Sequence, residues 1–115
     1  MLLRESSKAI NLDVETQATM GSQGADSVNH GDQLVDFAEA VTYGSHNIIS
    51  SGRILRSSLG DNGFIEAAAI VGIFNGLVRT ADSTGIPLDE PMKLATKSER
   101  ASLGINQFKG SENTL

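Results

Sequence analysis

The side chains best placed to do chemistry form a polar stripe within an apolar stretch. Asn75, Arg79 and Asp82 are spaced four and then three residues apart, so on a helix they share one face. Such a stripe can line a polar site in the core of a helical bundle. A structural role is favoured, because charged side chains are rarely left unpaired in a protein interior. We expect Arg79 to pair with Asp82, and Asn75 to bond across a helix or subunit interface.

The other groups suited to acid–base chemistry are isolated in the sequence. Glu66 lies near the start of the apolar stretch, where the helix dipole favours an acidic side chain. His30 and His46 fall in polar, loop-like segments, and neither takes part in an HxxxH or HxxE pattern. We therefore expect no metal site and no cofactor. Glu66, His46 and Arg79 remain the candidates for catalysis.

The composition excludes several classes of function. The 115 residues include no cysteine, which rules out disulfides, thiolate metal sites and cysteine chemistry in this chain. The net charge is −5 and the nine basic residues are scattered, which argues against nucleic-acid and anionic-membrane partners. No unbroken apolar run reaches the roughly 18 residues of a membrane-spanning helix. We expect a soluble protein of the cytoplasm or another intracellular compartment.

Two helices are predicted before the apolar stretch. The first covers residues 32–43, with Asp32 as its N-cap and Gly44 as its left-handed stop. The second covers about 51–59 and ends at Gly60, although its start can lie earlier. Its predicted apolar stripe consists of Ile54, Leu55 and Leu59.

The third predicted helix contains the polar stripe. It opens at Asp61, runs over residues 61–84 and stops at Gly85, and Pro87 prevents its continuation. Apolar residues cover most of its circumference, which is typical of a helix buried on several sides. The predicted large fillers of the core are Phe37, Phe64 and Phe74.

Two short helices can cover only part of this long one. The long helix therefore needs partners beyond these 115 residues, and we predict a homo-oligomer formed through it. Gly72 and Gly76 lie four residues apart, a spacing that lets another helix approach closely.

The chain ends are polar, so the fold is predicted to be an all-α helical-bundle fragment with loop-rich ends. Residues 1–31 are expected to be flexible, with one helical turn near 12–19. Residues 32–90 form the helical domain. Residues 91–115 form a polar tail with a helical turn at Leu94 and Ala95.

The central block resembles the carboxymuconolactone decarboxylase/alkylhydroperoxidase-D-like (AhpD-like) family. The matching pieces occur in the family's order and spacing, over about half of the chain, and include FAEAVT, FN, AD and GIPLD. They lie at 37–42, 59–61, 65–67, 74–75, 79, 81–82 and 85–89.

The resemblance implies an all-α fold that assembles as dimers, trimers or hexamers. The family's peroxidase branch reduces hydroperoxides with a CxxC pair on a preceding helix, and its decarboxylase branch acts on a carboxylated lactone without that pair. This chain has no thiol, so no thiol-site residue carries over. We expect the C-terminal half of a longer family member, inactive alone as a peroxidase.

Two other functions stay open. In a decarboxylase-like enzyme, Glu66, His46 or Arg79 would contact a small carboxylate. In a non-enzymatic module, the long helix would serve only for assembly.

Overall fold

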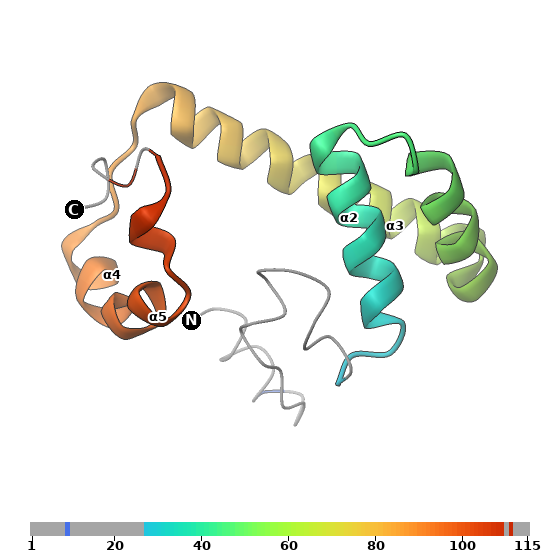
Figure 1. Cartoon of the computed structure of the whole chain (residues 1–115), viewed down its shortest axis with the longest axis horizontal. Helices are drawn as coiled ribbons and strands as arrows, with labels where there is room; N and C mark the ends of the chain where they lie inside the picture. The colour runs from blue at the N-terminus through green and yellow to red at the C-terminus, as the bar shows by residue number, and fades with distance from the viewer. Residues whose placement is uncertain (1–8, 10–26, 110, 112–115) are drawn as a thin grey trace.

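The computed structural model describes residues 9, 27–109 and 111 of the chain. Within these residues the structure is helical and contains no strand, which confirms the predicted all-α fold. The predicted turn at 12–19 and most of the segment 1–31 lie outside the described residues. The elements are α2 (Gly31–Tyr43), α3 (Ile48–Thr84), α4 (Glu90–Ala95), α5 (Lys97–Ser102) and η2 (Ile105–Gln107) (Figure 1).

Helix α2 begins one residue earlier than its predicted cap. The N-cap is His30, in a left-handed conformation with φ 58°, and Asp32 lies exposed in the first turn. The prediction of Asp32 as the N-cap is therefore wrong. The C-terminus follows the prediction: Gly44 has φ 63°, and the Ser45 and Gly44 amides donate to the carbonyls of Ala40 and Val41. These two bonds form a Schellman motif, which satisfies carbonyls that the helix itself leaves free.

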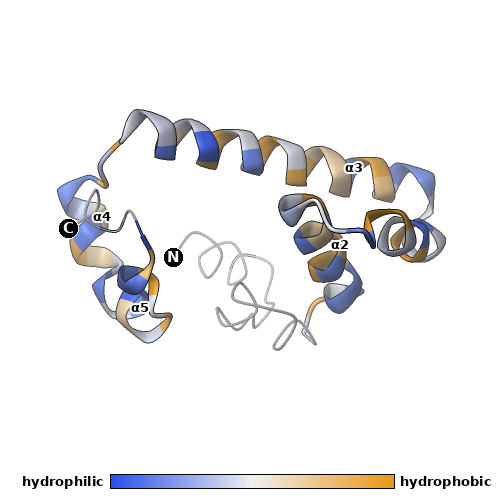
Figure 2. Cartoon of the chain, turned by 45° about the horizontal axis from the view of Figure 1, so that its top comes forward, coloured by the Kyte–Doolittle hydropathy of each residue, from blue (hydrophilic) through white to orange (hydrophobic). Residues whose placement is uncertain are grey.

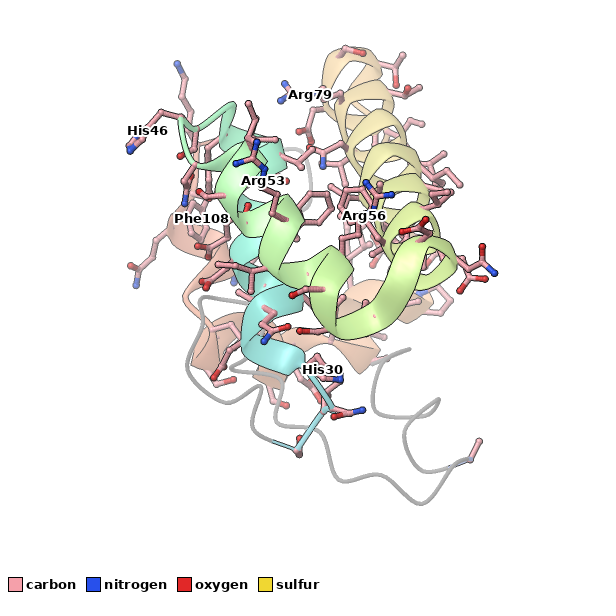
Figure 3. The ribbon with its side chains drawn as sticks, turned by 90° about the vertical axis from the view of Figure 1, so that its right-hand side faces the viewer. His30, His46, Arg53, Arg56, Arg79 and Phe108 are labelled. Carbon is pink, nitrogen blue, oxygen red and sulfur yellow. The ribbon has the colours of Figure 1, made fainter. Side chains whose placement is uncertain are left out.

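The second and third predicted helices form one element, α3, which bends at Gly60. Gly60 has φ 74° and ψ 178°, a backbone conformation essentially confined to glycine. The element begins at Ile48, so the second helix extends back through the serines. It ends at Gly85 as predicted, with φ 65° and the Ile86 amide donating to Ala81. The chain changes direction between the two halves of α3 (Figure 3).

The core lies where α2 meets both halves of α3. Phe37 of α2 and Phe64 of α3 are in contact, with ring centroids 5.4 Å apart and ring planes tilted by 58°. Gly52 lies between them, since a β-carbon there would stand 3.5 Å from each ring. Leu55 is fully buried beside this cluster, and Ala67 closes it from the second half of α3.

Two predicted core residues lie outside this cluster. Ile54 is 54% exposed, because Leu55 rather than Ile54 faces α2. Phe74 is 63% exposed, because at this level of α3 the helix turns Val71 and Asn75 toward α2 and Phe74 away from it. Phe37 and Phe64 are the two fillers that the structure confirms.

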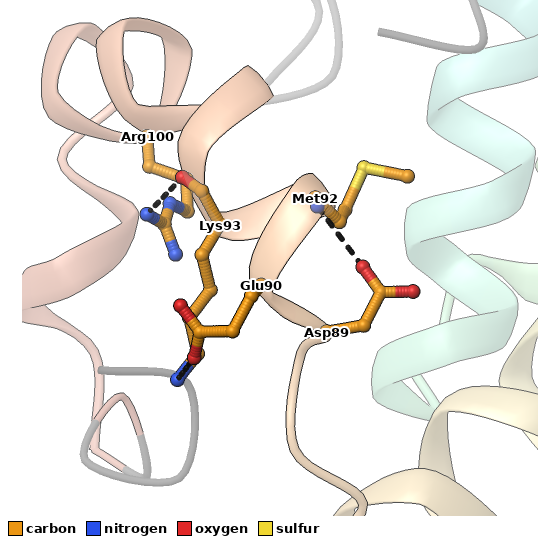
Figure 4. A network of polar contacts seen from close by, with 5 residues as sticks. All are labelled: Asp89, Glu90, Met92, Lys93 and Arg100. Atoms are coloured by element: carbon orange, nitrogen blue, oxygen red, sulfur yellow. Dashed lines mark hydrogen bonds and ion pairs between the residues drawn. The ribbon is translucent and has the colours of Figure 1, made fainter.

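The segment predicted as a polar tail folds into α4 and α5. Asp89 caps α4 by accepting a hydrogen bond from the Met92 amide at 3.0 Å (Figure 4). Arg100 of α5 donates through Nη2 to the Lys93 carbonyl at 2.9 Å, which ties the two short helices together (Figure 4). The predicted turn at Leu94 is confirmed as part of α4.

Candidate functional site: the apolar face of α3

Asn75, the first residue of the polar stripe on α3, has a structural role. Asn75 donates through Nδ2 to the Thr42 hydroxyl of α2 at 3.0 Å, and to the Val71 carbonyl at 3.0 Å. The predicted bond across a helix is therefore confirmed. Arg79 and Asp82 are exposed, and among the described residues no ion pair joins them, so the predicted pairing is wrong. Exposed side chains are solvated, and nothing forces them to pair.

The three candidates for catalysis do not form a site. Glu66 and Arg79 lie exposed on the second half of α3, and His46 lies exposed in the loop before α3. Figure 3 shows His46 at the edge of the molecule and Arg79 on a separate helix. No hydrogen bond or ion pair connects them within the described part of the chain, where no cluster of three potential metal ligands occurs either.

The ion pair across the bend in α3 was not anticipated from the sequence, and neither was that of Lys93 with Glu90 in α4 (Figure 4). Arg56 Nε lies 2.7 Å from Asp61 Oδ1, across the bend at Gly60. This hydrogen bond and the charge attraction lower the pKa of Asp61 and raise that of Arg56. Asp61 therefore binds Arg56 instead of capping the helix. The sequence did contain a signal for this ion pair, because a basic and an acidic residue flank the predicted end of a helix at Gly60.

A small polar hollow lies between the start of α2 and the start of α3. Its volume is about 130 Å³. Gln33 Oε1 is buried there without a hydrogen-bond partner, while Ser51 donates its hydroxyl to the Asn47 carbonyl at 3.0 Å. The hollow offers no cation and no activated nucleophile, so it suits ordered water rather than a substrate. Its lining is Gln33, Asp36, Asn47, Ser50, Ser51 and Ile54.

The most unusual surface is the second half of α3. Beyond the contact with α2, no other described element packs extensively along it (Figures 1 and 2). Five large apolar side chains that share one side of this helix are each between 55% and 63% exposed, whereas Phe64 and Val71 pack toward the core. We call this surface the α3 face, and it consists of Ile70, Ile73, Phe74, Leu77 and Val78.

The spacing of the α3 face is that of a helix-packing surface. Ile70, Ile73, Phe74 and Leu77 occur at i, i+3, i+4 and i+7, which aligns them along one side of the helix. Single exposed apolar residues are ordinary on proteins, but a contiguous group marks an interaction site.

Helix α3 is also long and apolar enough, by length and composition, to cross a membrane. An 18-residue window reaches a mean hydropathy of 1.4, and none of that window is buried. No unbroken apolar run reaches this length, but the mean hydropathy of the window passes although Gly72 and Gly76 interrupt the run. The helix carries Glu66, Asn75 and Arg79, and Asn75 is bonded to α2. Charged side chains are costly in a bilayer.

Comparison with known proteins finds no similar one. No family model matches the chain, and neither a curated protein nor a solved structure is similar to it. The family resemblance thus remains a prediction from the residues.

Proposed function

We propose that this chain is a soluble, non-catalytic helical module that binds another helix through the α3 face. The observation that carries the proposal is the grouping of large apolar side chains on that face, each more than half exposed. A helix laid along such a surface removes the apolar area from water, at roughly 25 cal/mol per Å². Proteins that bind a helix in an apolar groove recognise side chains at this same i, i+3, i+4 and i+7 spacing.

The electrostatics of the described residues support a non-catalytic role. Active sites cluster groups with perturbed pKa values in a cleft. Here the pKa values of Arg56 and Asp61 are shifted by their mutual contact, and both side chains are more than half exposed on the surface rather than in a cleft. Among the described residues, the catalytic candidates Glu66, His46 and Arg79 have no partner that would activate them.

The enzymatic alternatives make distinct predictions. A decarboxylase-like site would bind small carboxylates and raise the melting temperature. A peroxidase-like activity would consume alkyl hydroperoxide, and would have to do so without a thiol. We expect neither a thermal shift nor hydroperoxide consumption.

A dye-binding experiment tests the α3 face itself. Anilinonaphthalene sulfonate fluoresces on exposed apolar surface. At dilution, the wild-type chain should enhance its fluorescence, and the double variant Phe74→Ser/Leu77→Ser should lose most of that signal. Tyr43→Ser, which removes an exposed aromatic residue on α2, is the matched control and should retain it. An unchanged signal from the double variant, or a carboxylate-dependent thermal shift, would contradict the proposal.

A further inference from the structure

We propose that Asn62 is a site of spontaneous deamidation, and that Asn75, which also precedes a glycine, is protected from this reaction by its contacts. The dipeptide Asn-Gly occurs twice in the sequence, at 62–63 and at 75–76. Both copies lie in the second half of α3. The inference goes beyond helix binding, because neither asparagine belongs to the α3 face.

The reaction joins the asparagine side chain to the next main-chain amide. The Gly63 amide nitrogen gives up its proton to hydroxide and attacks Cγ of Asn62, the Cγ–Nδ2 bond breaks, and the leaving nitrogen takes up a proton as ammonia. Water then opens the resulting succinimide ring at either carbonyl, which yields aspartate or isoaspartate. Nothing is oxidised or reduced, and one water is consumed for each ammonia released. Glycine favours the attack, because it has no β-carbon to hinder the approach.

Asn62 lies in the first turn after the break in α3. Gly60, with φ 74° and ψ 178°, interrupts the helical torsions two residues earlier. Helical torsions hold the Gly63 nitrogen away from Cγ, so the attack requires this turn to open. A helix leaves its first amides without an intrahelical partner, and terminal turns open at low cost in free energy. The Asp61 carboxylate does not close the turn, because it binds Arg56.

The side chain of Asn62 is accessible and unrestrained. It is exposed, and within the described part of the chain it takes part in no hydrogen bond or ion pair. Water and hydroxide therefore reach the reacting atoms, and no bond has to be broken before Cγ turns toward the Gly63 nitrogen.

Asn75 has the opposite surroundings. It lies in the interior of the same helix, where opening a turn breaks hydrogen bonds on both sides of it. Its Nδ2, the atom that would leave as ammonia, donates to the Thr42 hydroxyl and to the Val71 carbonyl, each at 3.0 Å. Reaction at Asn75 must first break these bonds, so the same dipeptide is held in an unreactive geometry.

Deamidation at Asn62 changes the start of the second half of α3. Isoaspartate lengthens the main chain by one methylene group, two residues before Phe64. The Phe64 ring belongs to the core, where its centroid lies 5.4 Å from that of Phe37. The modification therefore acts on the contact that joins the second half of α3 to α2.

Mass spectrometry of the full chain after incubation in mildly alkaline buffer tests the proposal. No lysine or arginine lies between Arg56 and Arg79, so trypsin releases both asparagines in one peptide, residues 57–79. Fragmentation of this peptide locates each conversion of an amide to a carboxyl group. In the folded chain Asn62 should react more than about ten times faster than Asn75, because its turn opens more readily. In water labelled with heavy oxygen, the new carboxyl group should carry the label.

Unfolding and one substitution show whether the fold causes the difference. In guanidinium chloride both sites should react at similar rates, because the two dipeptides are then equally free. Thr42→Val removes an acceptor of the Asn75 amide, and should accelerate the reaction at Asn75 while leaving that at Asn62 unchanged. Asn62→Gln is the control that identifies the product of residue 62.

Two results would overturn the proposal. The first is an Asn62 that stays unmodified in the folded chain while the unfolded chain reacts there. The second is a folded chain in which Asn75 reacts as fast as Asn62, because the contacts of Asn75 would then give no protection.

Discussion

The two halves of α3 use apolar residues in opposite ways. Before Gly60 the helix buries Ser51, Gly52 and Leu55 against α2, and five of its twelve residues, 48–59, are apolar. After Gly60 a similar share of residues is apolar, twelve of the twenty-four in 61–84, yet Ala67 is its one buried residue. Burial therefore follows from the presence of a facing helix and not from local hydrophobicity. Within the described residues, the second half is the one that lacks a facing helix along its apolar side.

The largest expected effect comes from the buried half. Leu55→Ala should destabilise the chain by about 2–5 kcal/mol, because it opens a cavity at the centre of the core. Leu77→Ala is the matched change in the exposed half. In dilute monomer it should cost less than about 0.5 kcal/mol. Urea denaturation of both variants measures the difference, and equal losses at dilution would contradict the contrast between the halves.

The bend between the halves is the next test. Gly60→Ala should cost about 1–3 kcal/mol, because alanine does not tolerate the backbone angles found there. Gly76→Ala, in open helix, should stabilise the dilute monomer by up to about 1 kcal/mol. If thermal melting shows that Gly60→Ala is neutral, the halves are not held by this bend.

A smaller effect is expected at Asn75, near the end of the contact between α2 and the second half of α3. Asn75→Ala removes the hydrogen bond to Thr42 and should cost about 1 kcal/mol. Thr42→Val removes the acceptor from the other side. A double-mutant cycle by chemical denaturation should show a non-additive coupling, whereas fully additive losses would mean that the bond is not formed.

The smallest effect concerns the ion pair across the bend. The pKa of Asp61 is lowered by Arg56, so this pair stabilises the fold above the unfolded-state pKa of Asp61. The contribution disappears as the pH falls through the folded-state pKa. Both groups are exposed, so salt should largely screen it. Carboxyl NMR titration should show a higher Asp61 pKa in Arg56→Gln than in wild type, and an unchanged value would contradict the pairing.

Local chemistry explains which parts of the fold could be predicted from the sequence. Gly44, Gly60 and Gly85 interrupt or end helices as predicted, because each adopts a positive φ that other residues disfavour. The choice of Leu55 over Ile54 for the core was not predictable, because it depends on where α2 packs. The cap at Asp32 failed because His30 begins the helix instead.

The candidate site was only partly readable from the sequence. The apolar residues after Gly60 predicted a helix buried on several sides, but among the described residues only α2 packs along it and Ala67 is the one buried residue there. The polar hollow was missed, because its lining comes from two separate stretches of sequence, 33–36 and 47–54, whose proximity depends on packing. The fold of residues 90–102 was missed because α4 and α5 are short and polar. Asp89 and the Arg100 bond to Lys93 hold them together.

Hydrogen exchange across α3, measured in dilute protein, tests the central claim most directly. The claim is that the first half of α3 is held by its packing on α2, whereas the end of the second half is not packed against another described element. It predicts that amides in residues 51–59 exchange more slowly than amides in residues 77–83. Equal protection of these two segments would contradict the account.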